Sequence, residues 1–117
     1  MINSDRANVG VAPVSINMNA VAAARAKAQD MITNNYFGHV SPTYGMPGQM
    51  LNQFGVNWRS TGENIAETAS VYIADMDFLT STEGHREIML GTSYNQVGVG
   101  VIPYNGSVVV VEEFVQD

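Results

Sequence analysis

Apolar residues recur every three to four positions between residues 15 and 37, and this spacing predicts a long amphipathic helix. Alanine, the strongest helix former, is abundant in the same stretch. Asn19, Lys27 and Asp30 are predicted to lie on the polar face, and Asn34-Asn35 is predicted to end the helix. The predicted apolar face carries Met18, Val21, Ala24, Ala28, Met31 and Ile32.

Shorter elements are predicted on both sides of this helix. Asn3-Ser4-Asp5 offers N-caps for a short first helix or turn. Residues 38–62 are rich in glycine and proline turn formers, and a short helix at 47–54 fits because proline suits a first helical turn. The remaining predicted segments are a brief ordered stretch at 63–68 and helices at 71–79 and 84–90.

The end of the chain has a β pattern, with strands predicted at 97–102 and 108–115 from their β-branched residues. Asn105-Gly106 between them is the strongest short-range hairpin signal. Because helices come first and a hairpin last, we predict an α+β fold with an antiparallel sheet. A doubly wound nucleotide-binding fold is disfavoured, because it needs alternating strands and helices.

Composition narrows the class of protein further. A length of 117 residues predicts one domain over residues 1–117. The absence of cysteine excludes disulfides, thiolate metal ligands and a cysteine nucleophile. A net charge of -6, with basic residues that form no run, predicts that the protein does not bind nucleic acid or an anionic membrane.

No apolar stretch approaches the ~20 residues of a membrane span, so no transmembrane segment is expected. Residues 1–6 lack the basic and apolar regions of a signal peptide. If the natural protein is exported, its signal therefore lies outside this sequence.

The two histidines, His39 and His85, are the first candidates for chemistry. Both follow a glycine at the predicted end or start of a helix, where side chains tend to face clefts. A neutral imidazole binds zinc, copper or nickel and serves as a general base near neutral pH. Local sequence alone favours the plainer interpretation that each histidine is a hydrogen-bonding loop residue.

Two acids are further candidates. Glu63, in Gly62-Glu63-Asn64, is either an inward-facing polar group or an acid at a helix N-terminus, and spacing leaves both interpretations open. Glu83 lies two residues before His85 and is either a ligand of the same ion or a solvated turn acid. The gaps between these residues are long, so spacing alone does not specify a metal site. No Gly-x-Ser-x-Gly or His-Glu-x-x-His motif is present.

Six short motifs follow one another along almost the whole chain. They are Asn3-Ser4-Asp5-Arg6, Asn35-Tyr36-Phe37-Gly38-His39-Val40-Ser41-Pro42, Gly62-Glu63-Asn64-Ile65-Ala66, Gly84-His85-Arg86, Val97-Gly98-Val99-Gly100 and Glu112-Glu113-Phe114. In their order and spacing these motifs resemble the CAP superfamily of cysteine-rich secretory, antigen 5 and pathogenesis-related proteins, in its cysteine-free bacterial, SCP-like branch. The resemblance implies a three-layer α-β-α sandwich around a central antiparallel sheet.

The resemblance also implies a cleft in which two histidines and acidic residues converge. Mapped onto this sequence, the histidines are His39 and His85, and the first acid is Glu63. Glu83 is a fourth candidate ligand, next to an apparent one-residue insertion. The chain departs from the family pattern at Phe78, where tryptophan is usual, and at Glu87, where bacterial members usually have alanine.

The function that follows from this resemblance is an extracellular or cell-surface binding domain without an established reaction. Its cleft is expected to hold a divalent cation, with zinc as the preferred ion, and no organic cofactor is expected. The expected ligand is a cell-wall component, a lipid or a protein. The alternative is a metal-dependent hydrolase of peptide or cell-wall substrates, with Glu63 as the general base. A third interpretation is a structural or partner-binding module, in which the histidines and acids only hold the helices together.

Overall fold

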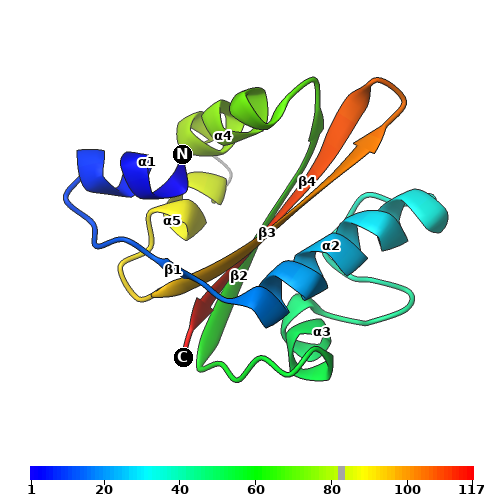
Figure 1. Ribbon diagram of the computed structural model, residues 1–117, viewed down its shortest axis with the longest axis horizontal. Coiled ribbons are helices and arrows are strands. Elements are labelled where there is room, and N and C mark those ends of the chain that lie inside the picture. The colour runs from blue at the N-terminus through cyan, green and yellow to red at the C-terminus, as the bar shows by residue number, and fades with distance from the viewer. Residues whose placement is uncertain (82–83) are drawn as a thin grey trace.

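A computed structural model describes residues 1–81 and 84–117 and has three layers (Figure 1). A sheet separates α2 and α3 on one face from α1, α4 and α5 on the other. This arrangement confirms the predicted α+β, three-layer fold. The elements follow in the order α1 (Ile2–Asn8), β1 (Ser15–Ile16), α2 (Met18–Thr33), α3 (Pro47–Gln53), β2 (Ser60–Thr68), α4 (Val71–Thr80), α5 (His85–Met89), β3 (Gln96–Tyr104) and β4 (Ser107–Gln116).

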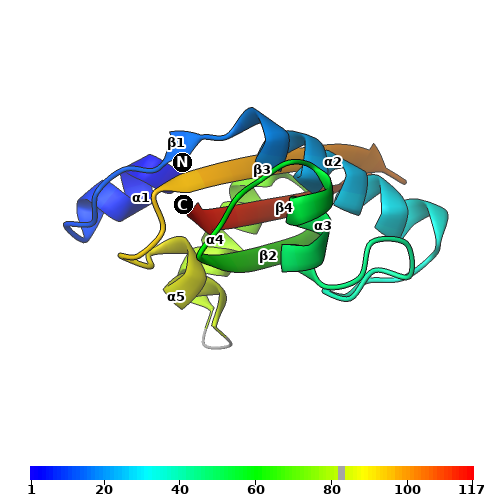
Figure 2. The same ribbon diagram turned by 90° about the horizontal axis from the view of Figure 1, so that it is seen from below.

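The sheet has the strand order β1-β3-β4-β2. The β3–β4 and β2–β4 pairs are antiparallel as predicted, whereas β1 adds a short parallel pair to β3. β2 is therefore an edge strand, and both α3 and α5 pack against it (Figure 2). The turn between β3 and β4 has positive φ at Asn105 (50°) and Gly106 (77°), as the predicted hairpin requires.

The long helix is shorter at both ends than the predicted range of 15–37. Its start moves to Met18 because the side chain of Asn17 accepts hydrogen bonds from the first free backbone N–H groups of the helix. Ser15 and Ile16, just before this cap, are extended and pair with β3. At the other end the helix stops at Thr33, and Asn35 takes the left-handed conformation with φ of 53°.

α2 lies directly on the backbone of β3, at two glycines of the strand. A Cβ atom added to Gly98 would lie 2.2 Å from the carbonyl carbon of Ala20. At Gly100 it would lie 2.5 Å from the carbonyl carbon of Ala24. Small residues on both elements therefore set how closely helix and sheet pack.

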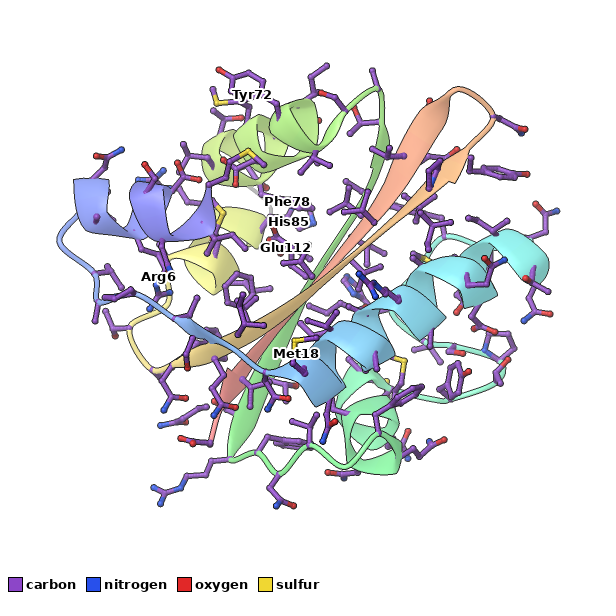
Figure 3. The ribbon with its side chains drawn as sticks, viewed as in Figure 1. Arg6, Met18, Tyr72, Phe78, His85 and Glu112 are labelled. Atoms are coloured by element: carbon purple, nitrogen blue, oxygen red, sulfur yellow. The ribbon has the colours of Figure 1, made fainter. Side chains whose placement is uncertain are left out.

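Arg6 joins α1 to the loop that follows α5 (Figure 3). Its side chain is 1% exposed, and its guanidinium donates hydrogen bonds to the backbone carbonyls of Ala12, Met89, Gly91 and Tyr94. Burial lowers the pKa of Arg6, yet the four carbonyl acceptors satisfy four of its five N–H donors. This contact fixes α5, and with it His85, against the rest of the protein.

Candidate functional site

The structure brings His39 and Glu63 into contact at the outer strand of the sheet. Nδ1 of His39 lies 2.8 Å from Oε1 of Glu63. The Glu63 side chain is 2% exposed, whereas that of His39 is 51% exposed. A buried carboxylate therefore orients an accessible imidazole. When Nδ1 carries the proton that Glu63 accepts, Nε2 keeps a free lone pair.

Asp30 holds the loop that carries His39. Its carboxylate accepts hydrogen bonds from the Tyr36 and Ser41 hydroxyls, both at 2.5 Å, and from Thr43 Oγ1 and Asn34 Nδ2, both at 2.6 Å. Burial alone would raise the pKa of Asp30, but these donors outweigh it and hold the pKa below its usual value. Asp30 is thus a positioning residue for the loop around His39.

Lys27 lies one turn before Asp30 on α2 and holds the same loop. Its Nζ donates a hydrogen bond of 2.6 Å to the backbone oxygen of His39. Burial lowers the pKa of Lys27, and the charge of Glu63 opposes that effect. The prediction that Lys27 and Asp30 lie on a polar, outward face was wrong: they are 1% and 7% exposed, because they bind the loop rather than water.

Glu113 on β4 lies directly opposite Glu63 on β2 and is fully buried. Burial first, and then the neighbouring Glu63, raise the pKa of Glu113 well above its usual value, while Lys27 acts in the opposite direction. Neither carboxyl oxygen of Glu113 has a hydrogen-bond partner in the described part of the chain, so nothing offsets the cost of burying its charged form. Sequence reasoning missed this residue. The signal that could have identified it is an acid inside a run of β-branched strand residues.

A pocket of about 590 Å³ opens beside the His39–Glu63 pair. Trp58, the only tryptophan in the chain, lies on its wall and donates from Nε1 to the Gly48 carbonyl at 3.1 Å. The lining runs from α3 across β2 to α5 and consists of His39, Met46, Pro47, Gly48, Gln49, Asn52, Trp58, Thr61, Gly62, Glu63 and Ile88.

His85 has different neighbours. Its ring centroid is 5.5 Å from that of Phe78 (Figure 3), and its Nδ1 is 3.0 Å from the Ser81 hydroxyl. The backbone oxygen of His85 accepts a hydrogen bond from Asn64, the residue next to Glu63. His85 is not among the residues that line the 590 Å³ pocket.

The predicted ligand set is therefore only partly assembled. Glu83 lies outside the described residues. Within residues 1–81 and 84–117, no group of three or more histidines and acids is placed to hold a metal ion. The contact between His39 and Glu63 is observed, and the convergence of His85 and Glu83 with them stays a prediction.

A second set of buried acids lies on the other face of the sheet. Glu112 accepts a hydrogen bond of 3.3 Å from Asn64. Burial first, and then neighbouring acids, raise the pKa of Glu112 to about 8 and that of Asp75 to about 7. Asp5 is the neighbouring acid that acts on both. These carboxyl groups were not predicted from the sequence. Near neutral pH both hold their protons much more firmly than an exposed acid does.

Comparison with known proteins shows similarity over nearly the whole chain. The model of the CAP family, described as the cysteine-rich secretory protein family, matches residues 1–115. The uncharacterized protein YkwD of Bacillus subtilis is 37% identical over 102 residues, which cover 87% of this chain and 40% of YkwD. The uncharacterized membrane protein YlbC of the same organism is 34% identical over 101 residues, covering 86% of this chain and 29% of YlbC.

Solved structures share the fold. An extracellular protein with an SCP domain from Bacillus anthracis has a TM-score of 0.88 and 31% identity, covering 99% of this chain and 38% of that one. An outer surface protein of Borrelia burgdorferi has a TM-score of 0.89 at 17% identity, covering 98% of this chain and 86% of that one. The chain thus spans less than half of its Bacillus relatives. No helix in the described ranges is long and apolar enough to cross a membrane.

Proposed function

This chain belongs to the cysteine-rich secretory protein (CAP) family, and we propose that it is an extracellular, non-enzymatic binding domain whose ligand occupies the pocket beside His39. The observation that carries the proposal is the wall of that pocket, where the buried Glu63 carboxylate fixes the ring of an accessible histidine. A volume of about 590 Å³ lies in the range of small-molecule sites.

The chemistry of the wall indicates what such a ligand needs. Met46, Trp58 and Ile88 offer apolar and aromatic surface, while Gln49 and Asn52 offer amide groups. With Nδ1 committed to Glu63, neutral His39 presents Nε2 as an acceptor. The ligand class that fits has an apolar face and a hydroxyl or amide donor, as cell-wall sugars and hydroxylated lipids do.

Trp58 provides a direct assay, because it is the only tryptophan and lines the pocket. Tri-N-acetylglucosamine and dodecanol serve as the sugar and lipid probes, each titrated while the tryptophan emission is recorded. We expect a saturable change with at least one probe. His39→Ala should weaken binding by about tenfold, as expected when a buried polar contact is lost.

Glu87→Gln is the matched control, since Glu87 is exposed on α5 and does not line the pocket. It should leave both titrations unchanged. The proposal is wrong if neither probe gives a saturable signal, or if His39→Ala binds as tightly as the wild type while remaining folded.

Export is part of the proposal and is supported by the similarity to the extracellular Bacillus anthracis protein. Detection of the full-length protein in culture medium or on intact cells, with a cytosolic enzyme as the lysis control, tests it. Recovery only with the cytosolic marker would contradict it.

The predicted divalent cation fits the described residues poorly. Catalytic zinc sites use three protein ligands, whereas His39 and Glu63 are the two predicted ligands that contact each other within the described residues. The hydrolase alternative depends on Glu63 reaching a bound water, but this side chain is 2% exposed and already engaged by His39. Binding is therefore the function that the geometry favours.

A further inference from the structure

A second pocket, of about 220 Å³, lies apart from the one beside His39 and shares no residue with it. It joins the C-terminal end of α2, the outer strand β2 and the β3–β4 hairpin, which lie at the same end of the molecule (Figure 1). We call it the α2-end pocket. Its lining consists of Met31, Ile32, Asn35, Tyr36, Phe37, Glu67, Tyr104 and Val109.

Aromatic rings form much of the wall of the α2-end pocket. Phe37 is 54% exposed and Tyr104 is 37% exposed. Neither ring packs against another aromatic ring in the described part of the chain. Both side chains are therefore partly accessible to a ligand, although such rings normally gain stability from burial.

Tyr36 is the third ring of the wall, and it already interacts with a cation. Nζ of Lys27 lies 5.2 Å from its ring centroid. The Tyr36 hydroxyl donates to the Asp30 carboxylate at 2.5 Å, which makes the ring richer in electrons. Electron-rich rings attract cations through their negative faces. Because Lys27 already takes this interaction, Tyr36 contributes wall surface, and Phe37 and Tyr104 are the rings left for a ligand cation.

The one charged residue among the described ones that line the α2-end pocket, Glu67, favours a cation. Glu67 lies opposite Val109 in the β2–β4 register, is exposed, and forms no ion pair or hydrogen bond with any described residue. No lysine, arginine or histidine is among the described residues that line the pocket. The C-terminal end of α2, whose helix dipole is negative there, adds to the attraction.

We propose that the α2-end pocket binds a quaternary or methylated ammonium group. Phe37 and Tyr104 would face the cation, Glu67 would balance its charge, and the apolar floor would contact its methyl groups. A divalent metal ion does not fit, because a single carboxylate cannot replace its water shell. The space suffices, since a cavity of about 150 Å³ accommodates benzene.

Choline and 3,3-dimethyl-1-butanol, its uncharged analogue of the same shape, are the probes for the test. Each is titrated into the isotope-labelled chain, and the NMR shifts of the backbone amides are followed. We expect choline to shift the amides around residues 31–37, 67 and 104. We also expect it to bind about fivefold more tightly than the alcohol. Equal affinities, or shifts that cluster elsewhere, would overturn the proposal.

Variants separate the contribution of charge from that of the rings. Glu67→Gln should weaken choline binding by roughly fivefold at low salt, and less at high salt, because exposed charges are screened. Glu87→Gln removes an equal charge outside the pocket and should have no effect. Equal weakening by both variants would reveal only general attraction to an acidic protein and would refute a specific site.

Tyr104→Leu and Phe37→Leu keep apolar bulk but remove the ring faces. Each should weaken choline binding by roughly two- to fivefold and leave the weak binding of the alcohol unchanged. Thermal unfolding confirms that the variants fold. Choline affinity that survives both substitutions would overturn the role of the rings.

A vesicle experiment distinguishes the two sources of an ammonium group, a lipid headgroup and a free ligand. Cosedimentation with phosphatidylcholine vesicles but not with phosphatidylglycerol vesicles would indicate a lipid headgroup. Cosedimentation with neither would indicate a free ammonium ligand.

Discussion

Glu63 and Glu113 face each other directly across β2 and β4, both are buried, and Glu63 contacts the ring of His39. Two carboxyl groups in this position cannot both ionise at low cost, and burial together with Glu63 raises the pKa of Glu113 well above its usual value, while Glu63 orients the histidine. The buried Lys27 compensates the remaining negative charge. The candidate site therefore lies next to a buried acid whose charged form is costly.

Replacing Glu113 by glutamine tests this arrangement. Glu113→Gln mimics the protonated acid and should stabilise the protein at pH 8 by roughly 1 to 2 kcal/mol, because folding no longer requires proton uptake. The gain should vanish near pH 4. Urea unfolding at both pH values measures it. Glu87→Gln should change stability by less than about 0.5 kcal/mol. A loss of stability at pH 8 would indicate that Lys27 needs a second carboxylate.

The dependence of stability on pH should have a defined sign between pH 5 and 8. The pKa of Glu112 is raised from 4.5 to about 8, and that of Asp75 from 3.8 to about 7, so the folded state binds more protons. Their contribution is complete below pH 4 and is lost as the pH rises toward 8. We expect a lower melting temperature at pH 8 than at pH 5 by calorimetry, and a smaller difference in Glu112→Gln. A flat profile would contradict these pKa shifts.

Asp30→Asn should loosen the loop that carries His39. An amide cannot accept the four hydrogen bonds that the carboxylate accepts, so we expect a loss of roughly 2 to 3 kcal/mol in urea unfolding. Hydrogen exchange at the Thr43 and Tyr44 amides, which bond to Ser41, should accelerate. Asp77→Asn, at an exposed position of α4, is the control. Unchanged exchange would mean that Asp30 does not position the loop.

Gly98→Ala should be among the most damaging single substitutions. The added methyl group would collide with the backbone of α2, only 2.2 Å away at Ala20. We expect a loss of about 3 kcal/mol or more in chemical unfolding. Gly38→Ala, where no atom lies within 4 Å of an added Cβ, should be tolerated. Near-normal stability of Gly98→Ala would show that α2 can move away from β3 at little cost.

The cation prediction is tested by titrating zinc into the metal-free chain in a calorimeter. If His39 and His85 converge on a metal, the heat of binding should be lost in His39→Ala/His85→Ala and retained in Glu87→Gln. The same heat in the wild type and the double variant would end the metal hypothesis. That result would not contradict the proposal that a ligand binds in the pocket beside His39.

The sequence by itself determined the helices, the terminal hairpin and the family. Spacing of apolar residues and the Asn105-Gly106 pair act over a few positions, so they can be interpreted locally. Resemblance to the family also assigned His39 and Glu63 to one site, and the structure brings them into contact. β2 was not recognised as a strand, because Ser60–Thr68 lacks an alternating pattern and takes its form from pairing with β4.

Only the tertiary structure decided which polar residues are buried. Lys27 and Asp30 fall on the polar side of a helical pattern, but a loop several residues later covers both. The loop accepts a hydrogen bond from Lys27 and donates one from Ser41 to Asp30. The pairing of Glu113 with Glu63 depends on strand register across 50 residues of sequence. Local patterns do not encode such contacts, because they arise from packing between segments that are distant in the chain.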